Sequence, residues 1–155
     1  MTKFYKKGIT IIELVIVLFI IGILASVTLP QFSKMKENQA LKNATGDIVS
    51  ALHGAQSQSL ASVNFSEYGV HFQSDKIIIF KGTVFLESDA NNKIINIVTP
   101  ASISNVTLAG VSGTSGDIYF NRLSGVPNKT GAITVSISSV SKIITISATG
   151  AVSIN

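Results

Sequence analysis

The side chains able to perform chemistry in this sequence are few. The chain has two histidines, His53 and His71, and no cysteine, so disulfides, thiolate metal ligands and cysteine nucleophiles are excluded. Two histidines alone do not make a metal site, and the sequence contains no Gly-x-Ser-x-Gly motif or phosphate-binding loop. Four acidic residues suit turns or a solvated surface better than a catalytic pair: Asp75, Glu87, Asp89 and Asp117. We therefore expect no catalytic site, cofactor or metal, and a membrane-tethered enzyme is the weakest of three functional hypotheses.

One carboxylate stands apart, because Glu13 lies within an uninterrupted apolar run from Ile9 to Leu29. An ionised side chain in lipid costs on the order of a few kcal/mol, so its presence requires a partner or a function. The alternative is that Glu13 has no function and is merely tolerated, because it lies near the membrane boundary and its side chain can extend to the cytoplasmic face. A plain signal anchor has no use for this carboxylate.

The apolar run predicts a single membrane-spanning helix. Twenty-one residues rise about 1.5 Å each and reach roughly 30 Å, the thickness of the hydrocarbon core. Three lysines precede the run, Lys3, Lys6 and Lys7. The positive-inside rule therefore places residues 1–8 in the cytoplasm and the residues after Leu29 outside it. The segment Leu24-Ala25-Ser26-Val27 only poorly imitates a conventional secretory cleavage site.

These residues resemble the class III signal of type IV prepilins and type II secretion pseudopilins, in the segment Lys6-Lys7-Gly8-Ile9-Thr10-Ile11-Ile12-Glu13-Leu14. The resemblance implies that a prepilin peptidase cuts between Gly8 and Ile9 and that Ile9 becomes the N-methylated first residue. Glu13 becomes the fifth mature residue, and Pro30 matches a position where pilins commonly carry proline. The departure is Ile9 itself, where phenylalanine or methionine is more usual, and this bears on cleavage efficiency.

The spacing also has a physical interpretation. Cleavage creates a new amine on each subunit, and a neighbour shifted along a filament can bring its amine to the Glu13 carboxylate. Because a buried unpaired charge is costly, pairing between subunits favours docking in one axial register. We therefore assign Glu13 to subunit assembly.

Overall charge gives little support for nucleic-acid binding. The full chain has 12 basic and 8 acidic residues, a formal net charge of +4. Removal of residues 1–8 takes away three lysines and leaves nine basic and eight acidic residues, a net charge of +1. A nearly neutral mature protein has no general attraction for phosphate.

Residues 30–62 predict an amphipathic continuation of the helix. An intermittent apolar stripe lies among lysines, glutamines and asparagines: Phe32, Met35, Leu41, Ile48, Leu52, Ala55 and Leu60. Pro30 removes one backbone donor, so we expect a kink or a short melted stretch over residues 28–30. The helix should fade between Ser59 and Asn64, where strong helix formers end.

Residues 63–155 predict an antiparallel β domain, so the fold class is α+β with a pilin-like order. Short runs rich in Ile, Val, Thr and Phe alternate with Gly, Asn, Ser and Pro. The expected strands cover residues 68–72, 76–81, 84–87, 94–98, 106–108, 117–121, 132–138 and 142–148, with an edge strand over 151–154. The clearest hairpin pairs Ile133, Val135 and Ile137 with Ile143 or Ile144 and with Ile146 and Ala148, and it should cover the helix.

The tail resembles the GspH/FimT family of minor pseudopilins and minor pilins, in three segments: Asp117-Ile-Tyr-Phe-Asn-Arg-Leu-Ser-Gly-Val-Pro, Gly131-Ala-Ile-Thr-Val, and Lys142-Ile-Ile-Thr-Ile-Ser with Gly150. Some FimT-like proteins are associated with DNA uptake through arginines near the last glycine. Here that run is Thr149-Gly150-Ala151-Val152, without basic residues. Arg122, Lys129 and Lys142 remain as scattered cations, which more often belong to a solvated surface.

The first functional hypothesis is a minor pilin or pseudopilin that helps to initiate or cap a type IV pilus or a secretion pseudopilus. Its expected partners are prepilin peptidase, other pilin or pseudopilin subunits, the inner-membrane assembly platform and, before assembly, membrane lipid. The expected location is the bacterial inner membrane and then a periplasmic or extracellular filament. The alternative is a DNA-binding or adhesive minor pilin that displays the loops Ser88–Asn92 and Gly110–Gly116.

Overall fold

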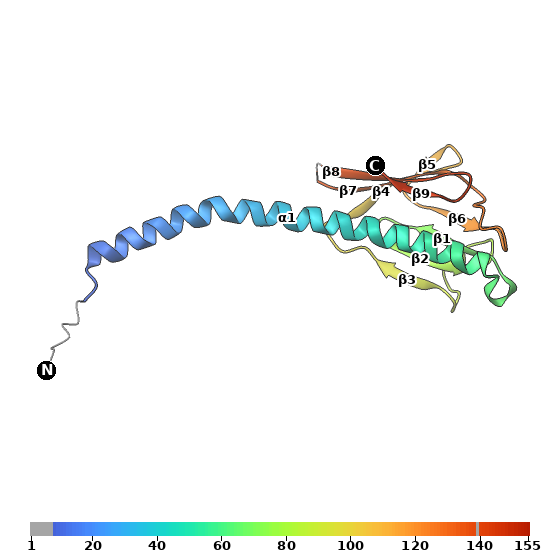
Figure 1. Cartoon of the computed structure of the whole chain (residues 1–155), viewed down its shortest axis with the longest axis horizontal. Coiled ribbons are helices and arrows are strands. Elements are labelled where there is room, and N and C mark those ends of the chain that lie inside the picture. Colours follow the sequence, from blue (N-terminus) through green and yellow to red (C-terminus); the bar gives the residue numbers. More distant parts are fainter. Residues whose placement is uncertain (1–7, 139) are drawn as a thin grey trace. The chain divides into compact units, whose positions relative to one another are not determined.

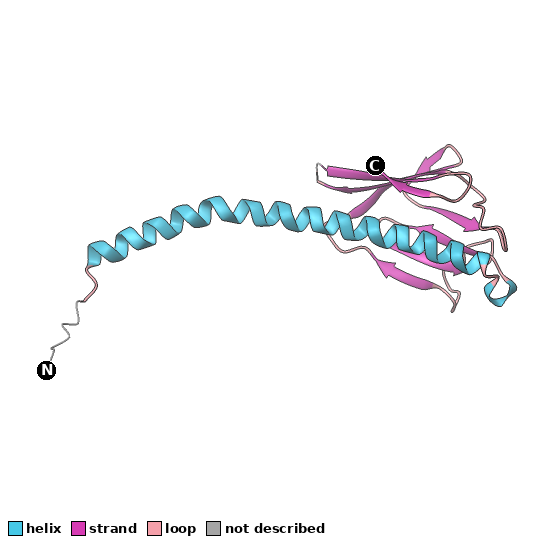
Figure 2. Ribbon diagram, in the orientation of Figure 1, coloured by secondary structure: helices cyan, strands magenta, loops and turns pink. Residues whose placement is uncertain are grey.

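The computed structural model describes residues 8–138 and 140–155, except for the side chains of residues 29 and 30. The chain forms two compact units, Met1–Lys36 and Glu37–Asn155. The helix α1 (Ile11–Leu60) contributes to both units, and all strands belong to the second (Figure 1). An apolar N-terminal helix followed by antiparallel sheets is the α+β, pilin-like fold that the sequence predicts (Figure 2).

In the first unit the helix begins at Ile11 and continues without interruption through residues 28–30. The expected melted stretch is therefore wrong, because the fixed φ of proline is itself helical and a helix can continue past one lost hydrogen bond. A bend at Pro30 stays a prediction.

In the second unit α1 ends at Leu60, within the range where the sequence predicts the helix to fade. A short 3₁₀ turn η1 (Val63–Phe65) leads into the sheets. The strands are β1 (Tyr68–Phe72), β2 (Lys76–Lys81), β3 (Lys93–Asn96), β4 (Ser102–Leu108), β5 (Val111–Gly113), β6 (Gly116–Phe120), β7 (Gly131–Ile137), β8 (Val140–Ile146) and β9 (Val152–Ile154).

All strand pairs are antiparallel, and the strands form two sheets. One sheet has the order β3-β2-β1-β6, and the other has the order β5-β4-β7-β8-β9. The predicted hairpin is β7–β8, with Ile133 opposite Ile144 and Gly131 opposite Ile146. The register therefore selects Ile144 rather than Ile143, and Ala148 lies beyond the strand. The last strand, β9, is an edge strand as expected.

One core holds this unit together, with α1 and both sheets contributing side chains. The helix supplies Leu41, Ile48, Leu52 and Ala55 from its predicted apolar stripe. The first sheet adds residues such as Val70 and Phe120, and the hairpin adds Ile133 and Ile144, so the hairpin does cover the helix. These side chains are almost fully removed from water, which is the dominant source of stability in such a domain. Phe32, Met35 and Leu60 from the same stripe are exposed.

Two strand predictions fail. Residues 84–87 form no strand, because the following residues hold Leu86 in a turn. The side-chain Nδ2 of Asn92 and the backbone N–H of Asp89 both donate to the Leu86 carbonyl oxygen. Conversely, β5 lies inside the segment Gly110–Gly116 that the sequence suggests as a loop. A three-residue strand that itself ends in glycine carries too little alternation to be identified from the sequence.

Candidate processing and assembly site

Thr10 caps the start of α1. Its side-chain Oγ1 accepts a hydrogen bond from the backbone N–H of Glu13 at 3.3 Å, and its carbonyl oxygen accepts one from the Leu14 N–H at 3.1 Å. A threonine followed three residues later by glutamate has the spacing of a capping box, which satisfies otherwise unpaired amides of the first turn. Glu13 thus occupies the third helical position, where the helix dipole favours a negative charge. The sequence analysis missed Thr10, although its spacing from Glu13 is a sufficient signal.

Gly8 and Ile9 lie outside the helix that Thr10 caps. Their backbone is non-helical, Ile9 is 78% exposed, and Gly8 is also exposed. A Cβ built on Gly8 would meet no atom within 4 Å, so the fold of this chain does not require glycine there. The Gly8–Ile9 bond can therefore be approached by an enzyme without unwinding of the helix.

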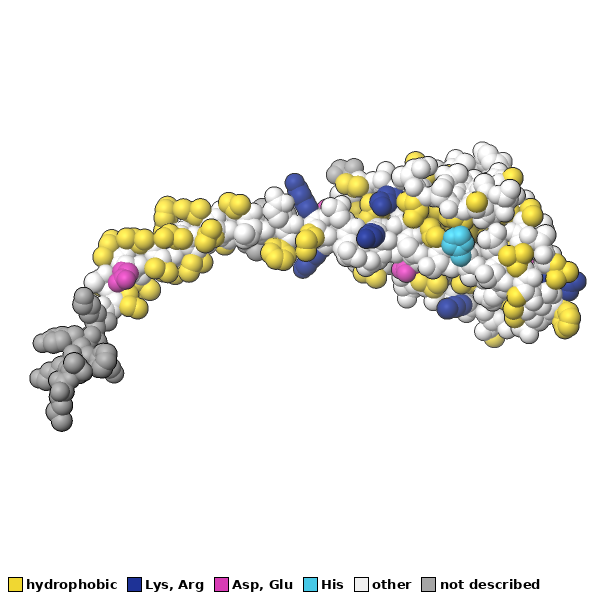
Figure 3. Space-filling view, in the orientation of Figure 1, with side chains coloured by type: hydrophobic (Ala, Val, Ile, Leu, Met, Phe, Trp, Pro, Cys, Tyr) yellow, Lys and Arg dark blue, Asp and Glu magenta, His cyan; other side chains and the backbone are white. Residues whose placement is uncertain are grey.

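The first unit exposes a continuous apolar helix surface. Its large aliphatic and aromatic side chains between Ile11 and Val27 are exposed. Figure 3 shows hydrophobic side chains along this part of the helix. Within the described residues, α1 is the one helix long and apolar enough to cross a membrane. A helix that is hydrophobic all round must be covered by lipid or by other protein.

The hydroxyl groups within this surface have partners in the helix itself. Ser26 Oγ donates to the carbonyl oxygen of Ile23 at 2.8 Å, and Thr28 Oγ1 donates to that of Leu24 at 3.0 Å. Such bonds let small polar side chains enter lipid at low cost. The Glu13 carboxylate differs, because no group among residues 8–138 and 140–155 forms a hydrogen bond or ion pair with it.

The family described as the prokaryotic N-terminal methylation motif matches residues 3–29. The match supports a type IV pilin-like subunit. It spans the predicted cleavage bond, the Glu13 position and the leader lysines, of which Lys3, Lys6 and Lys7 lie outside the described residues. No curated protein and no solved structure gave a significant match.

The pilin-like assignment has consequences for the first unit. The motif implies processing by a prepilin peptidase and assembly with other pilin-like subunits. The apolar helix near the N-terminus is consistent with anchoring in the inner membrane. The matched residues, 3–29, do not distinguish between branches of the superfamily.

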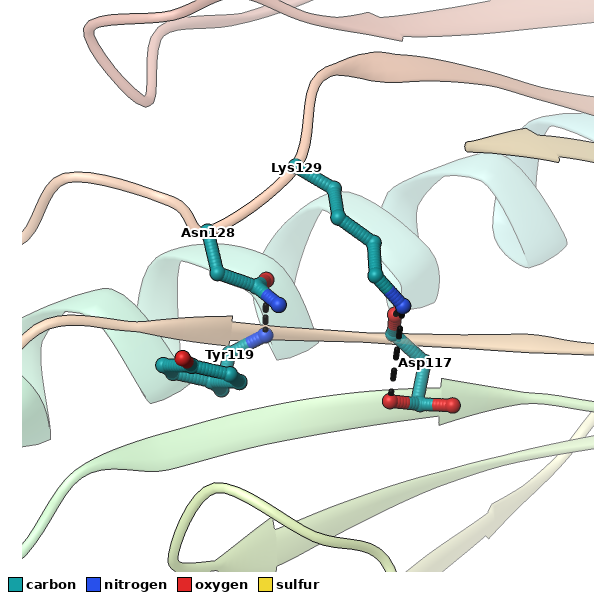
Figure 4. A network of polar contacts seen from close by, with 4 residues as sticks. All are labelled: Asp117, Tyr119, Asn128 and Lys129. Carbon is teal, nitrogen blue, oxygen red and sulfur yellow. Dashed lines mark hydrogen bonds and ion pairs between the residues drawn. The ribbon is translucent and has the colours of Figure 1, made fainter. Parts of the chain in front are cut away.

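Two of the basic side chains of the β domain have partners within it. Arg122 is exposed, and its Nη1 donates to the carbonyl oxygen of Phe65 at 3.1 Å. Lys129 lies 3.8 Å from a carboxylate oxygen of Asp117 and donates to the Asp117 carbonyl oxygen at 3.2 Å (Figure 4). Two of the three predicted cations are thus engaged locally, and nothing in this arrangement favours phosphate binding.

The two histidines lie on different elements. His53 is exposed on α1, whereas His71 is partly buried in β1. Within the part of the chain that the structure describes, no three His, Asp or Glu side chains come together in a group that could hold a metal ion. The predicted display loop Ser88–Asn92 is organised by its own side chains, with Asp89 Oδ1 accepting from the backbone N–H of Asn91 at 2.8 Å.

Proposed function

We propose that this chain is a minor pilin or pseudopilin of the GspH/FimT type, a structural subunit that helps to start or cap a type IV pilus or a secretion pseudopilus. The supporting observation is the placement of Glu13 among exposed apolar side chains, one helical turn after a bond that lies open to a peptidase. The tail segments that resemble this branch supply β6, β7 and β8, which form much of the two sheets.

Processing is the first step. Before cleavage, the lysines of the leader hold the N-terminus at the cytoplasmic face, and the apolar helix lies in lipid. Cleavage after Gly8 removes these charges and turns the Ile9 nitrogen into a cationic amine. N-methylation of Ile9 keeps the positive charge of the amine, so its pairing with a carboxylate remains favourable.

Assembly is the second step. The Glu13 carboxylate and the new amine both lose water when helices pack, and each is costly without a counter-charge. A neighbouring subunit displaced along the filament axis supplies the amine to this carboxylate. Wrong registers leave both charges unpaired, so the pair selects one register as well as stabilising it. The inner-membrane assembly platform would present the subunits to one another.

The decisive experiment is to determine the N-terminus of the protein isolated from its native cell. We expect the mature chain to begin with N-methylated Ile9, which peptide mass spectrometry identifies directly. A chain that still begins at Met1 would overturn the proposal, because the amine that pairs with Glu13 would never form.

A variant at the cleavage bond gives a second test. Gly8→Val should leave an uncut precursor on a gel, and the open space around Gly8 means that misfolding would not explain the defect. Gly22→Val is the matched control, because Gly22 also has no atom within 4 Å of a built Cβ but lies away from the bond. Normal processing of Gly8→Val would contradict the proposed peptidase site.

A further inference from the structure

The loop between β2 and β3 covers the outer side of the first sheet. Along β2, Ile77 belongs to the common core, so the alternate residues Ile78 and Phe80 point to the opposite side of the sheet. Both of these are nevertheless only 1% exposed. The Phe80 ring contacts the ring of Phe85, in this loop, edge to face. We call residues 83–92 the lid.

The lid is attached to the sheet through one aromatic ring. Of residues 83–88, Phe85 is the one whose side chain is not exposed. Among the described residues, each hydrogen bond of the lid joins two of its own members, as when Asn92 Nδ2 donates to the Leu86 carbonyl oxygen. These bonds keep the lid in shape, but they do not tie it to β1 or β2. The lid can therefore lift as a unit when Phe85 leaves its place.

Phe85 rests on His71. The two rings are stacked, with centroids 3.9 Å apart and planes 6° apart. His71 lies directly opposite Ile78 in the ladder between β1 and β2, so Phe85 covers the corner that His71 and Ile78 form with Phe80. The lid is thus anchored on a side chain whose ordinary pKa lies between pH 5 and 8.

Protonation of His71 is unfavourable while the lid is closed. Its Nδ1 is buried, and no hydrogen-bond partner of this atom lies among the described residues. In the neutral ring with its proton on Nε2, Nδ1 is an acceptor. A second proton turns it into a charged donor, and a buried donor without an acceptor is costly. The charged ring is therefore stabilised by water, which reaches it when the lid lifts.

Ionisable groups from three elements face His71. β6 presents Asp117, directly opposite His71 in the ladder, the lid presents Glu87, and β2 presents Lys76. Removal from water has the largest effect and lowers the pKa of His71 below its usual 6.5; the two carboxylates oppose this shift and Lys76 adds to it. Lys129 stands 3.8 Å from Asp117 and balances part of that negative charge. An open lid returns the ring to water and to its usual pKa.

We propose that the lid is an acid-opened cover of the first sheet. At neutral pH the uncharged ring of His71 holds Phe85 in place and keeps Ile78 and Phe80 out of water. In acid the imidazolium moves into water, Phe85 is released, and the lid lifts from an apolar surface that it otherwise covers. The inference does not depend on the proposed function, because the lid lies within the β domain.

The open lid binds a proton more readily than the closed lid, so the equilibrium constant for opening rises as the pH falls. With a pKa of 6.5 for the open ring and a lower value for the closed one, this constant increases by up to about tenfold between pH 7.5 and 5.5. Above pH 7.5 it no longer changes, because the ring is neutral in both states.

Cysteine labelling beneath the lid tests the proposal, and the absence of natural cysteine means that each variant carries one thiol. Ile78→Cys places the thiol under the lid, Ile77→Cys places it on the adjacent core residue, and Val98→Cys provides an exposed reference at each pH. The full chain in detergent is treated with a pyridyl disulfide, which labels thiols in mild acid. We expect the Ile78→Cys rate, relative to that of Val98→Cys, to rise by up to about tenfold from pH 7.5 to 5.5.

Two variants in the Ile78→Cys background identify the anchor. His71→Phe keeps an aromatic ring under Phe85 but cannot take up a proton, so labelling should be slow and, relative to the reference, independent of pH. Phe85→Ala removes the ring that holds the lid, so labelling should be fast at both pH values. Slow labelling of Phe85→Ala would overturn the proposal.

Two further outcomes would contradict it. One is a relative rate for Ile78→Cys that does not change with pH, or that still rises in His71→Phe. The other is equal labelling of Ile78→Cys and Ile77→Cys at pH 5.5, because both thiols would then be exposed by unfolding of the whole domain; we expect Ile78→Cys to react at least tenfold faster. None of these results concerns the N-terminus of the mature chain, which tests the proposed function separately.

Discussion

The imidazole ring of His71 lies flat on the phenyl ring of Phe85, with ring centroids 3.9 Å apart and planes 6° apart. Phe85 also contacts Phe80 edge to face, with centroids 5.7 Å apart. The loop after β2 is thereby fixed over the outer side of the first sheet. No hydrogen-bond partner of the buried His71 Nδ1 lies among the described residues.

This stacking predicts that stability depends on pH. Burial lowers the pKa of His71 below its usual 6.5, although Asp117 and Glu87 oppose the shift and Lys76 adds to it. The unfolded chain therefore binds a proton at higher pH than the folded one. The stabilisation is complete above about pH 6.5 and falls as the pH drops through the folded pKa.

Thermal unfolding of the full chain in detergent at a series of pH values measures this effect. His71→Gln should flatten the loss of stability below pH 6.5, whereas His53→Gln, at the exposed histidine, should not. An unchanged pH profile in His71→Gln would show that another group is responsible.

The charge of Glu13 can be separated from its place in the helix cap. Glu13→Gln keeps a capping-box residue but removes the charge, so we expect normal membrane insertion and cleavage with a severe loss of assembled filament. Thr10→Ser keeps the cap and should assemble normally, while Thr10→Val should weaken the helix start by about 1 kcal/mol. Filament yield and helix content by circular dichroism are the measurements. Full assembly of Glu13→Gln would rule out the charge pair.

Ser59 joins the end of α1 to the first strand. The Tyr68 N–H donates to Ser59 Oγ at 2.8 Å, and the serine is completely buried. Ser59→Ala should cost about 1–3 kcal/mol in the free energy of unfolding, because the Tyr68 amide is left buried without a partner. Ser57→Ala, at an exposed position of the same helix, should change stability by less than about 0.5 kcal/mol. Equal losses in the two variants would contradict this role.

Gly131 marks a close approach between β7 and β4. A Cβ there would lie 2.9 Å from Leu108 Cα and closer still to the Thr107 carbonyl oxygen, and backbone atoms cannot move aside. Gly131→Ala should therefore destabilise the domain by about 1–3 kcal/mol. Gly46→Ala meets no atom within 4 Å and lies in α1, so it should stabilise by up to about 1 kcal/mol. Chemical denaturation compares the two variants.

The sequence by itself determined the parts of this protein that depend on local order. The apolar run, the lysines before it and the single carboxylate within it identify the pilin-like N-terminus, because hydropathy and charge act along a continuous segment. Short runs rich in β-branched and aromatic residues likewise located β1 and β2 at their observed bounds. The Thr10 cap, which the sequence analysis missed, could also have been predicted, because Thr10 and Glu13 have the spacing of a capping box.

Only the tertiary structure decided how distant segments meet. The split into two sheets, the choice of Ile144 over Ile143 and the short strand β5 depend on pairing partners far away in the sequence. Phe85 lies in a loop and not in the predicted strand, with its ring stacked on that of His71, and the side chain of Asn92 bonds the neighbouring Leu86 carbonyl oxygen. Such contacts are invisible in the sequence, since they join residues whose proximity exists only after the chain has folded.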